Sequence, residues 1–304
     1  MTLTSTATIP VIDFGPFLQG EESDRDRVAQ EIYQACSTIG FMYLRNHGIP
    51  VELLQQLLAQ AQGFFQLPLD LKETVARSPD TNCGYIAVQT ERLDPGQPWD
   101  LKEAFNMGLE VVWPSEPVTF QPVVSDFYRC CTEQVAPNVL EAFAIALGLP
   151  HRYFDDKHGR NYFLRMLHYP PVDQQPQPGQ LRAGAHTDYG SITLLLQDDI
   201  GGLEVQTRDG QWVAAPPIPG TVVVNVGDAM QRWTNDRLSS TRHRVAVPTG
   251  DDAGRSRYSV ALFCDPNPEV LIDCLPQCIT SDRPRRYPPI LMRDHLLSKL
   301  TATY

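Results

Sequence analysis

His186 and Asp188 stand two residues apart in the segment GAHTDYGSITLLLQ, and their types and spacing are typical of metal ligands. In extended chain, residues i and i+2 point to the same face, so the imidazole and the carboxylate can converge on one point. The same alternation continues through Ile192, Leu194 and Leu196, which predicts that this face is the interior of a β core. Because burying these two polar groups is costly unless they are paired or metal-bound, we expect a compensating group.

His243 is the third candidate ligand. It opens the strand-like run HRVAV, in which Val245 and Val247 share its parity, and the chain from Asp188 to His243 leaves room for several short strands. Two imidazoles and one carboxylate form the open-sided triad that is typical of non-haem Fe(II) oxygenases. A structural zinc site would need a closed set of four ligands, and no convincing fourth is present. On these residues alone, a pair of polar surface residues stays open as the alternative for His186 and Asp188.

A carboxylate-binding pair is predicted in the segment RYSVALF. Arg257, Ser259 and Phe263 share one face of the expected strand, so a guanidinium and a hydroxyl lie one pleat apart. Together they can hold the two oxygens of a carboxylate. Arg255 and Ser256 are a competing pair close by, and Arg257 is preferred because its parity matches that of Ser259 and Phe263.

The first half of the chain carries mainly helical patterns. Apolar spacing and turn residues predict a short strand at Ile9–Phe14, helices at Asp24–Ile39 and about 50–65, a strand at Phe41–Leu44, a loop-rich section at about 67–120, and a helix at about 124–147 that Pro137 kinks or breaks. Gly40 is a fitting end for the first of these helices.

The second half changes character, because short β-branched or alternating runs separated by Gly- and Pro-rich turns predict an all-β sandwich or jelly roll. These runs are Tyr162–Tyr169, Ser191–Gln197, Leu203–Gln206, Trp212–Ala214, Thr221–Val226, Arg244–Val247 and Arg257–Phe263. The fold class expected is mainly β with flanking helices. We expect one domain over residues 1–304, with a helical, loop-rich part at about 1–160, a jelly-roll core at about 161–280 and a last helix at about 289–300.

Composition and charge narrow the partners. The formal net charge is −11, and no basic run of five or more residues occurs, so nucleic acid and anionic membrane surfaces are not expected as partners. No apolar run approaches the ~20 residues that span a bilayer, and no secretory signal is visible at the start. The seven cysteines form no CxxC pair, which favours reduced thiols in the cytoplasm. We expect a monomer that binds a small molecule.

These motifs together resemble the isopenicillin N synthase-like family of Fe(II)/2-oxoglutarate-dependent dioxygenases. The resemblance covers nearly the whole chain and includes IPVIDF, GFMYLRNHGIP, DLKEAFN, LRMLHYPP, the HTD triplet, NVGDAMQRWTNDRLSSTRHRV and RYSVALF. It implies a double-stranded β-helix (jelly-roll) core. It also implies that His186, Asp188 and His243 bind Fe(II), and that Arg257 and Ser259 grip the distal carboxylate of 2-oxoglutarate.

The resemblance also bears on residues around the cosubstrate. Tyr169 matches a tyrosine that often adds a hydrogen bond to the same carboxylate. Many relatives place an asparagine two residues earlier, where this chain has Leu167, so that part of the pattern departs from the family. Asn225 falls in a recurring family element that we interpret as a shaped turn.

The implied activity is oxidation, by default hydroxylation, of a small organic molecule with O₂ as cosubstrate and release of succinate and CO₂. Phe263 and Leu203 are candidate walls of the substrate pocket, and Phe105 is a candidate cover; ordinary core packing is the alternative for each. Two other functions stay open: an Fe(II) oxidase of the same fold that does not use 2-oxoglutarate, and a non-catalytic module that binds a metal or carboxylate ligand.

Overall fold

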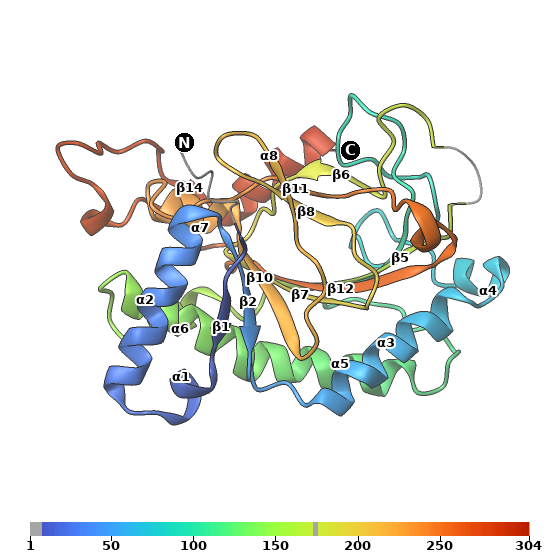
Figure 1. Ribbon diagram of the computed structural model, residues 1–304, viewed down its shortest axis with the longest axis horizontal. Helices are drawn as coiled ribbons and strands as arrows, with labels where there is room; N and C mark the ends of the chain where they lie inside the picture. Colours follow the sequence, from blue (N-terminus) through green and yellow to red (C-terminus); the bar gives the residue numbers. More distant parts are fainter. Residues whose placement is uncertain (1–7, 173–175, 304) are drawn as a thin grey trace.

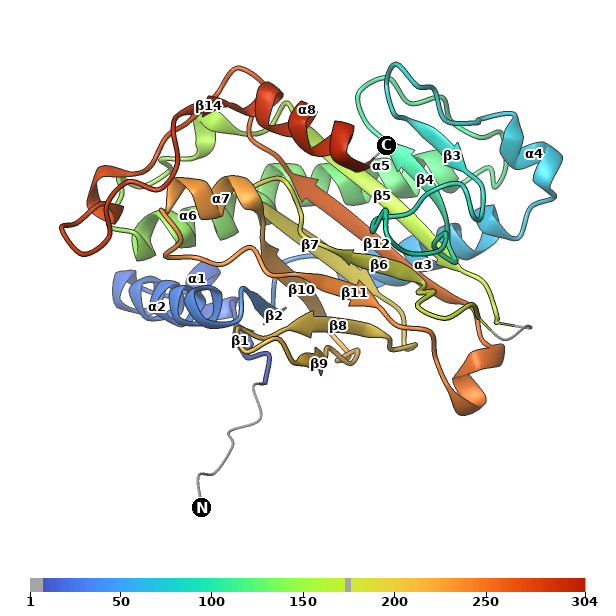
Figure 2. The same ribbon diagram turned by 90° about the horizontal axis from the view of Figure 1, so that it is seen from above.

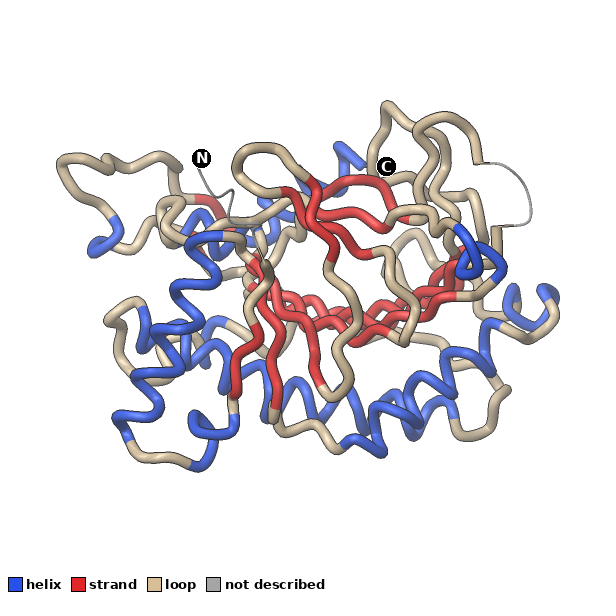
Figure 3. The backbone as a smooth tube through the Cα atoms, viewed as in Figure 1, coloured by secondary structure: helices blue, strands red, loops and turns tan. Residues whose placement is uncertain are grey.

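The computed structural model describes residues 8–172 and 176–303. Two β sheets face each other, and helices cover the outer face of the larger one (Figures 1 and 3). The larger sheet has eight strands, in the spatial order β1 (Val11–Asp13), β2 (Phe41–Arg45), β10 (Thr221–Val226), β7 (Ile192–Gln197), β12 (Arg257–Cys264), β5 (Tyr162–Tyr169), β4 (Glu103–Met107) and β3 (Gly84–Ile86).

The smaller sheet has four antiparallel strands. They are, in spatial order, β6 (Ala183–His186), β11 (His243–Val245), β8 (Leu203–Gln206) and β9 (Trp212–Ala214). A two-stranded ladder, β13 (Leu271–Ile272) with β14 (Ile290–Leu291), lies outside both sheets. The expected jelly-roll sandwich is confirmed, and the space between its two sheets is where the site lies.

Eight α-helices occur in the described part of the chain. They are α1 (Gly15–Gln19), α2 (Glu22–Thr38), α3 (Val51–Phe65), α4 (Leu69–Glu73), α5 (Phe120–Cys130), α6 (Ala136–Ala146), α7 (Asp228–Trp233) and α8 (Met292–Thr303). Helix α2 ends at Thr38, and Gly40, two residues later, has a φ of 76°, a conformation that glycine adopts without strain. In the view turned by 90°, β9 and α8 lie at opposite edges of the molecule (Figure 2).

The predicted long helix at about 124–147 is interrupted earlier than Pro137. Helices α5 and α6 are joined by a π-helical stretch, Cys131–Val135, and Pro137 lies in the first turn of α6. A proline there removes one N–H from the hydrogen-bond ladder, so the irregularity falls in the turn before it.

The section at about 67–120 is less loop-like than predicted. It contains α4, β3 and β4, and every residue of β4 is buried in the larger sheet. Strands β1 to β4 of the first half therefore complete the sheet of the second half. The boundary at about residue 160 stays a prediction. No helix of the described residues has the length and hydropathy that crossing a membrane requires.

Candidate active site between the two sheets

The three candidate metal ligands meet at one point. The rings of His186, at the end of β6, and His243, at the start of β11, are paired across the smaller sheet with centroids 4.3 Å apart. Oδ1 of Asp188 lies 3.8 Å from Nε2 of His186 and 3.7 Å from Nε2 of His243. One ligand atom from each residue falls within 4.8 Å of the others, and no second such group occurs in residues 8–172 and 176–303.

Backbone carbonyls fix how both histidine rings present themselves. Nδ1 of His186 donates to the carbonyl of Gly184 at 2.8 Å, and Nδ1 of His243 donates to the carbonyl of Thr241 at 3.1 Å. Since a carbonyl can only accept, the proton of each neutral ring is on Nδ1. The lone pair of each Nε2 therefore faces the shared point, as a metal ligand requires.

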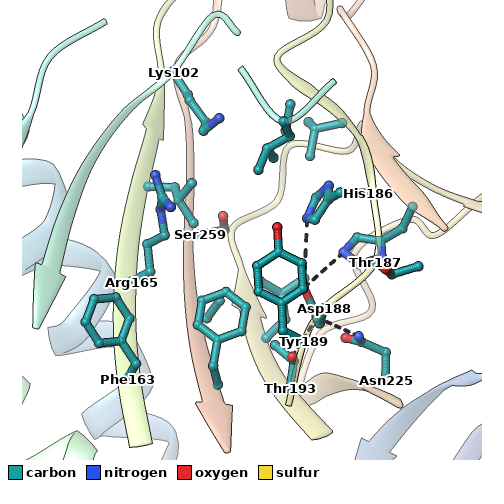
Figure 4. A pocket seen from close by; sticks show the side chains of 18 of the residues that line it. Lys102, Phe163, Arg165, His186, Thr187, Asp188, Tyr189, Thr193, Asn225 and Ser259 are labelled. Carbon is teal, nitrogen blue, oxygen red and sulfur yellow. Dashed lines mark hydrogen bonds and ion pairs between the residues drawn. The ribbon is translucent and has the colours of Figure 1, made fainter. Parts of the chain in front are cut away.

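Two side chains orient the carboxylate of Asp188. Thr193 donates to its Oδ2 at 2.6 Å, and Asn225 Nδ2 donates to the same oxygen at 2.7 Å (Figure 4). Oδ1 is thereby left to face the histidines. The sequence pattern suggested only that Asn225 shapes a turn. In the structure its amide also binds the carboxylate of Asp188 directly.

The protonation states of these groups suit a cation. Burial lowers the pKa of His186, and the neighbouring His243 lowers it further, so the ring is neutral near pH 7. Burial alone would raise the pKa of Asp188, but His243, His186 and the two hydrogen bonds outweigh it and the pKa falls. Since the His186 ring is neutral and Asp188 is ionised, the donor set of two imidazoles and one carboxylate fits Fe(II).

The predicted strand parity around the HTD triplet is wrong in part. Strand β6 stops at His186, and Asp188 lies in the turn between β6 and β7 rather than in a continuous strand. Ile192, Leu194 and Leu196 pack into the core under the helices, whereas Thr193 and Leu195 line the cavity between the sheets. The turn shifts the register by one, which exchanges the two faces of the strand.

The predicted face of β12 is correct. Arg257, Ser259, Ala261 and Phe263 line the cavity, and the alternating residues Tyr258, Val260 and Leu262 pack into the helix-side core. Arg255, the competing arginine, is exposed and makes an ion pair with Asp199. Arg257 rather than Arg255 therefore faces the cavity that the candidate metal ligands line.

Arg257 is 1% exposed and has only neutral partners. Its guanidinium donates to Oε1 of Gln197 at 3.0 Å, to the carbonyl of Ile200 at 3.2 Å and to Oγ of Ser259 at 3.2 Å. No Asp or Glu of the described residues makes an ion pair with it. A buried guanidinium without a counter-ion is costly, and a bound carboxylate would remove that cost.

Tyr169 and Leu167 lie beside Arg257 on β5. The ring of Tyr169 packs under the guanidinium, with the Arg257 Cζ 4.9 Å from the ring centroid. Leu167 pairs with Ser259 across the strands and lines the cavity. The wall on this side of Ser259 is therefore apolar.

The cavity between the sheets measures about 460 Å³, in the usual range for small-molecule sites. Phe263 and Leu203, the two candidate wall residues, line this cavity. Leu296 of α8 also lines it. Phe105 does not cover it: this side chain is fully buried on the helix side of β4 against Phe64 and Phe120. Strand alternation turns Phe105 to the opposite face.

Basic residues in the cavity wall were missed from the sequence. Lys102 and Arg165 line the cavity on the side opposite Asp188 (Figure 4). Lys102 forms an ion pair with Asp100, and Arg165 forms one with Glu91. Burial lowers the pKa of Lys102, and the charge of Asp100 opposes that effect. Lys102 lies three residues before Phe105 in DLKEAFN, so strand alternation turns the two side chains to opposite faces; that alternation was the available signal.

The chain was compared with known proteins. Residues 9–123 match the family model described as non-haem dioxygenase in morphine synthesis N-terminal, and residues 160–266 match that of the 2OG-Fe(II) oxygenase superfamily. The 2-oxoglutarate-Fe(II) type oxidoreductase hxnY of Emericella nidulans is 33% identical, over 97% of this chain and 90% of its own length. The proline hydroxylase buaE of Petromyces alliaceus is 37% identical, over 91% and 93%.

Solved structures point to the same family as the family models and the relatives. A full-length Neurospora crassa protein, crystallised with alpha-KG (2-oxoglutarate) and thymine, superposes with a TM-score of 0.90 at 37% identity, covering 99% of this chain and 98% of its own. The chain therefore belongs to the 2-oxoglutarate/Fe(II)-dependent dioxygenases, oxidoreductases that use Fe(II), 2-oxoglutarate and O₂.

Proposed function

We propose that this dioxygenase hydroxylates a small polar molecule, with His186, Asp188 and His243 as the Fe(II) ligands. Arg257 and Ser259 then hold the distal carboxylate of 2-oxoglutarate. The observation that carries this assignment is the buried guanidinium of Arg257, which makes no direct ion pair with an acidic residue of the described chain and faces the same cavity as the His–Asp–His group. A five-carbon diacid with one carboxylate on Arg257 would satisfy that charge.

The residues of this chain each have a defined task in the proposed reaction. The carbonyls of Gly184 and Thr241 keep Nε2 of each histidine unprotonated, and Thr193 and Asn225 turn Oδ1 of Asp188 toward the histidines. Fe(II) bound there supplies the activation of O₂ that no side chain can provide. The position of the site between the two sheets would limit the access of water to the reacting groups.

Tyr169 is proposed to stack on Arg257 and so to hold its guanidinium in place, with its hydroxyl close to the cosubstrate. Leu167 is proposed to leave the cosubstrate one hydrogen bond short of the pattern found in many relatives. Phe263 and Leu203 are proposed as apolar walls of the substrate region. The substrate names among the relatives, proline and thymine, support a substrate of about the size of one ring.

The decisive experiment measures succinate against O₂ consumed by the Fe(II)-loaded enzyme with 2-oxoglutarate and a panel of small substrates. Hydroxylation predicts one succinate for each O₂ consumed in coupled turnover. Oxygen uptake without succinate would instead indicate an oxidase of the same fold. Binding of 2-oxoglutarate without any turnover across the panel would favour a non-catalytic module.

We also propose that the protein acts as a single-domain monomer in the reducing cytoplasm. All seven cysteines are free thiols. Burial raises the thiol pKa of five of them, which are Cys36, Cys130, Cys131, Cys264 and Cys278. Light scattering after gel filtration and titration of thiols in denaturant test the two parts separately. A dimer mass, or fewer than seven titratable thiols without reductant, would contradict them.

A further inference from the structure

A second polar region lies in the cavity beyond the proposed iron site, at the end of β12 remote from Arg257. It consists of Asp265, which directly follows β12, and Asn161, which directly precedes β5. Both residues line the cavity. The last pair of the two strands is Cys264 with Tyr162, so Asp265 and Asn161 are the next residues along this antiparallel ladder.

This region is within reach of a substrate bound at the iron site. Phe263, on the same face of β12 as Asp265, pairs with Thr193, whose hydroxyl binds Asp188 at 2.6 Å. Asp265 follows Phe263 by two residues, about 7 Å along an extended chain. A one-ring substrate next to the proposed iron can therefore contact Asp265, while 2-oxoglutarate occupies the Arg257 end.

Asp265 is a buried carboxyl that lacks a protein partner. The residue is 7% exposed, and it makes no hydrogen bond or ion pair with any residue in the described ranges. Gly190 leaves the space that its side chain occupies, because a Cβ at Gly190 would lie 1.9 Å from Oδ1 of Asp265. A carboxyl that is buried, unpaired and adjacent to an open cavity costs stability, so a group supplied by a ligand is the natural partner.

Asn161 presents a second acceptor at the same end. Its Nδ2 donates to the carbonyl of Pro266 at 2.9 Å, and this bond fixes the orientation of the amide. Oδ1 has no donor among the residues that the structure describes. Ionised Asp265 and Oδ1 of Asn161 therefore offer two neighbouring acceptor sites to a ligand, which favours a group with N–H donors.

We propose that Asp265 and Asn161 bind an N–H group of the substrate, so that the enzyme selects nitrogen-bearing small molecules. This inference rests on the proposed function, because it places the substrate beside the His–Asp–His group. Lys102 and Arg165 line another wall of the cavity and offer N–H donors there. The substrate class that matches both walls carries an N–H donor at one end and a carbonyl or carboxylate at the other.

The test uses full-length protein loaded with Mn(II) and 2-oxoglutarate, and matched probes whose binding is measured by calorimetry. L-proline is compared with cyclopentanecarboxylate, which has the same ring size and carboxylate but no nitrogen, and thymine is compared with 1,3-dimethylthymine. We expect at least one nitrogen probe to bind about 10-fold or more tightly than its analogue. Asp265→Asn should abolish that preference, because a charge-assisted hydrogen bond is lost.

Asp80→Asn is the matched control, because Asp80 lines the same cavity but is exposed; it should leave the preference unchanged. Asp265→Asn should fold with an unchanged or higher melting temperature, since it removes an unpaired buried carboxyl. No preference in either pair of probes, or a preference that survives in Asp265→Asn, overturns the inference. Failure of the wild type to bind Mn(II) and 2-oxoglutarate would instead overturn the proposed function, and the same titrations measure this first.

Discussion

Asn225 Nδ2 donates to Oδ2 of Asp188 at 2.7 Å, and this contact joins β10 to the turn that follows β6. The amide occupies one carboxylate oxygen, so the other faces His186 and His243. The backbone supports the same arrangement, because the N–H of Asp228 donates to the carbonyl of Asp188 at 2.8 Å. The position of the carboxylate is therefore set by a strand of the larger sheet, although the two histidines belong to the smaller one.

Replacing Asn225 by Leu should weaken metal binding by roughly 10-fold to 100-fold, the usual effect of losing a partner that orients a metal ligand. The reason is that Asp188 keeps its charge but loses the bond that turns Oδ1 toward the histidines. Titration of the metal-free protein with Mn(II) measures the change. Asn138→Leu, on the outer helix α6, is the control and should bind Mn(II) as the wild type does. Unchanged affinity in Asn225→Leu would show that Thr193 and the backbone are sufficient to orient Asp188.

Replacing Asp188 by Ala should abolish retention of Fe(II) after anaerobic loading and desalting. The two imidazoles then remain without the one carboxylate of the set. Metal content measured by mass spectrometry decides the outcome. Asp265→Asn, which removes a different buried carboxyl of the same cavity, is the comparison and should keep its metal. Full occupancy in Asp188→Ala would remove Asp188 from the proposed ligands.

Replacing Arg257 by Ala should raise the dissociation constant of 2-oxoglutarate by roughly 30-fold or more, since a buried charge pair is broken. The iron site should stay loaded, because Arg257 touches none of its three residues in the described contacts. Arg255→Ala tests the competing assignment: Arg255 is exposed and already paired with Asp199, so its loss should change cosubstrate binding little. A larger rise of the dissociation constant in Arg255→Ala than in Arg257→Ala would indicate that Arg255 binds the carboxylate.

The alternation of residues along single strands was sufficient to predict much of this site. Arg257, Ser259 and Phe263 lie on one strand, so their shared face follows from alternation alone, and β12 has the parity that the sequence predicts. The predicted alternation failed in the HTD segment because β6 ends at His186 and the next strand, β7, begins only at Ile192. An intervening turn changes parity without an obvious mark in the sequence.

Other parts of the site depend on contacts between distant segments. Asn225 and Asp188 are brought together by the packing of β10 against β7, and Asp265 acquires its place from the absence of a side chain at Gly190. Phe105 was misplaced for a related reason. The DLKEAFN segment was expected to be loop, so alternation was not applied to it, and Lys102 rather than Phe105 faces the cavity.

Replacing Glu103 by Gln should destabilise the fold by roughly 3–5 kcal/mol, the usual cost of breaking a buried ion pair. Glu103 is 4% exposed and binds Lys72 at 2.8 Å and His168 at 2.7 Å, so the change leaves the buried ammonium of Lys72 without its counter-ion. Urea denaturation measures the free energy of unfolding. Glu31→Gln breaks the exposed pair with Arg27 and should cost less than about 1 kcal/mol. Equal effects in the two variants would contradict the role of burial.

His158 should make the metal-free protein less stable as the pH falls from about 6.5 to 4. Burial lowers the pKa of His158 to about 4, and the ring bonds the carbonyl of Phe154 at 3.0 Å and Oγ of Ser191 at 2.9 Å. Between the two pKa values the unfolded chain binds the extra proton and the folded protein does not. The contribution of neutral His158 to the free energy of unfolding is therefore complete above pH 6.5. It falls by about 3 kcal/mol in all as the pH is lowered to 4.

Urea unfolding of the metal-free protein at several pH values from 4.5 to 7.5 measures this dependence. His158→Gln lowers stability at pH 7 through lost packing, so the slope with pH, rather than the stability itself, is the quantity compared. The slope should be smaller in His158→Gln than in the wild type, and His151→Gln, at an exposed histidine, should keep the wild-type slope. The other histidines with lowered pKa values, His47, His186 and His295, are present in all three proteins and cancel from the comparison. Identical slopes in the wild type and His158→Gln would mean that the folded protein accepts a proton at His158 as readily as the unfolded chain does.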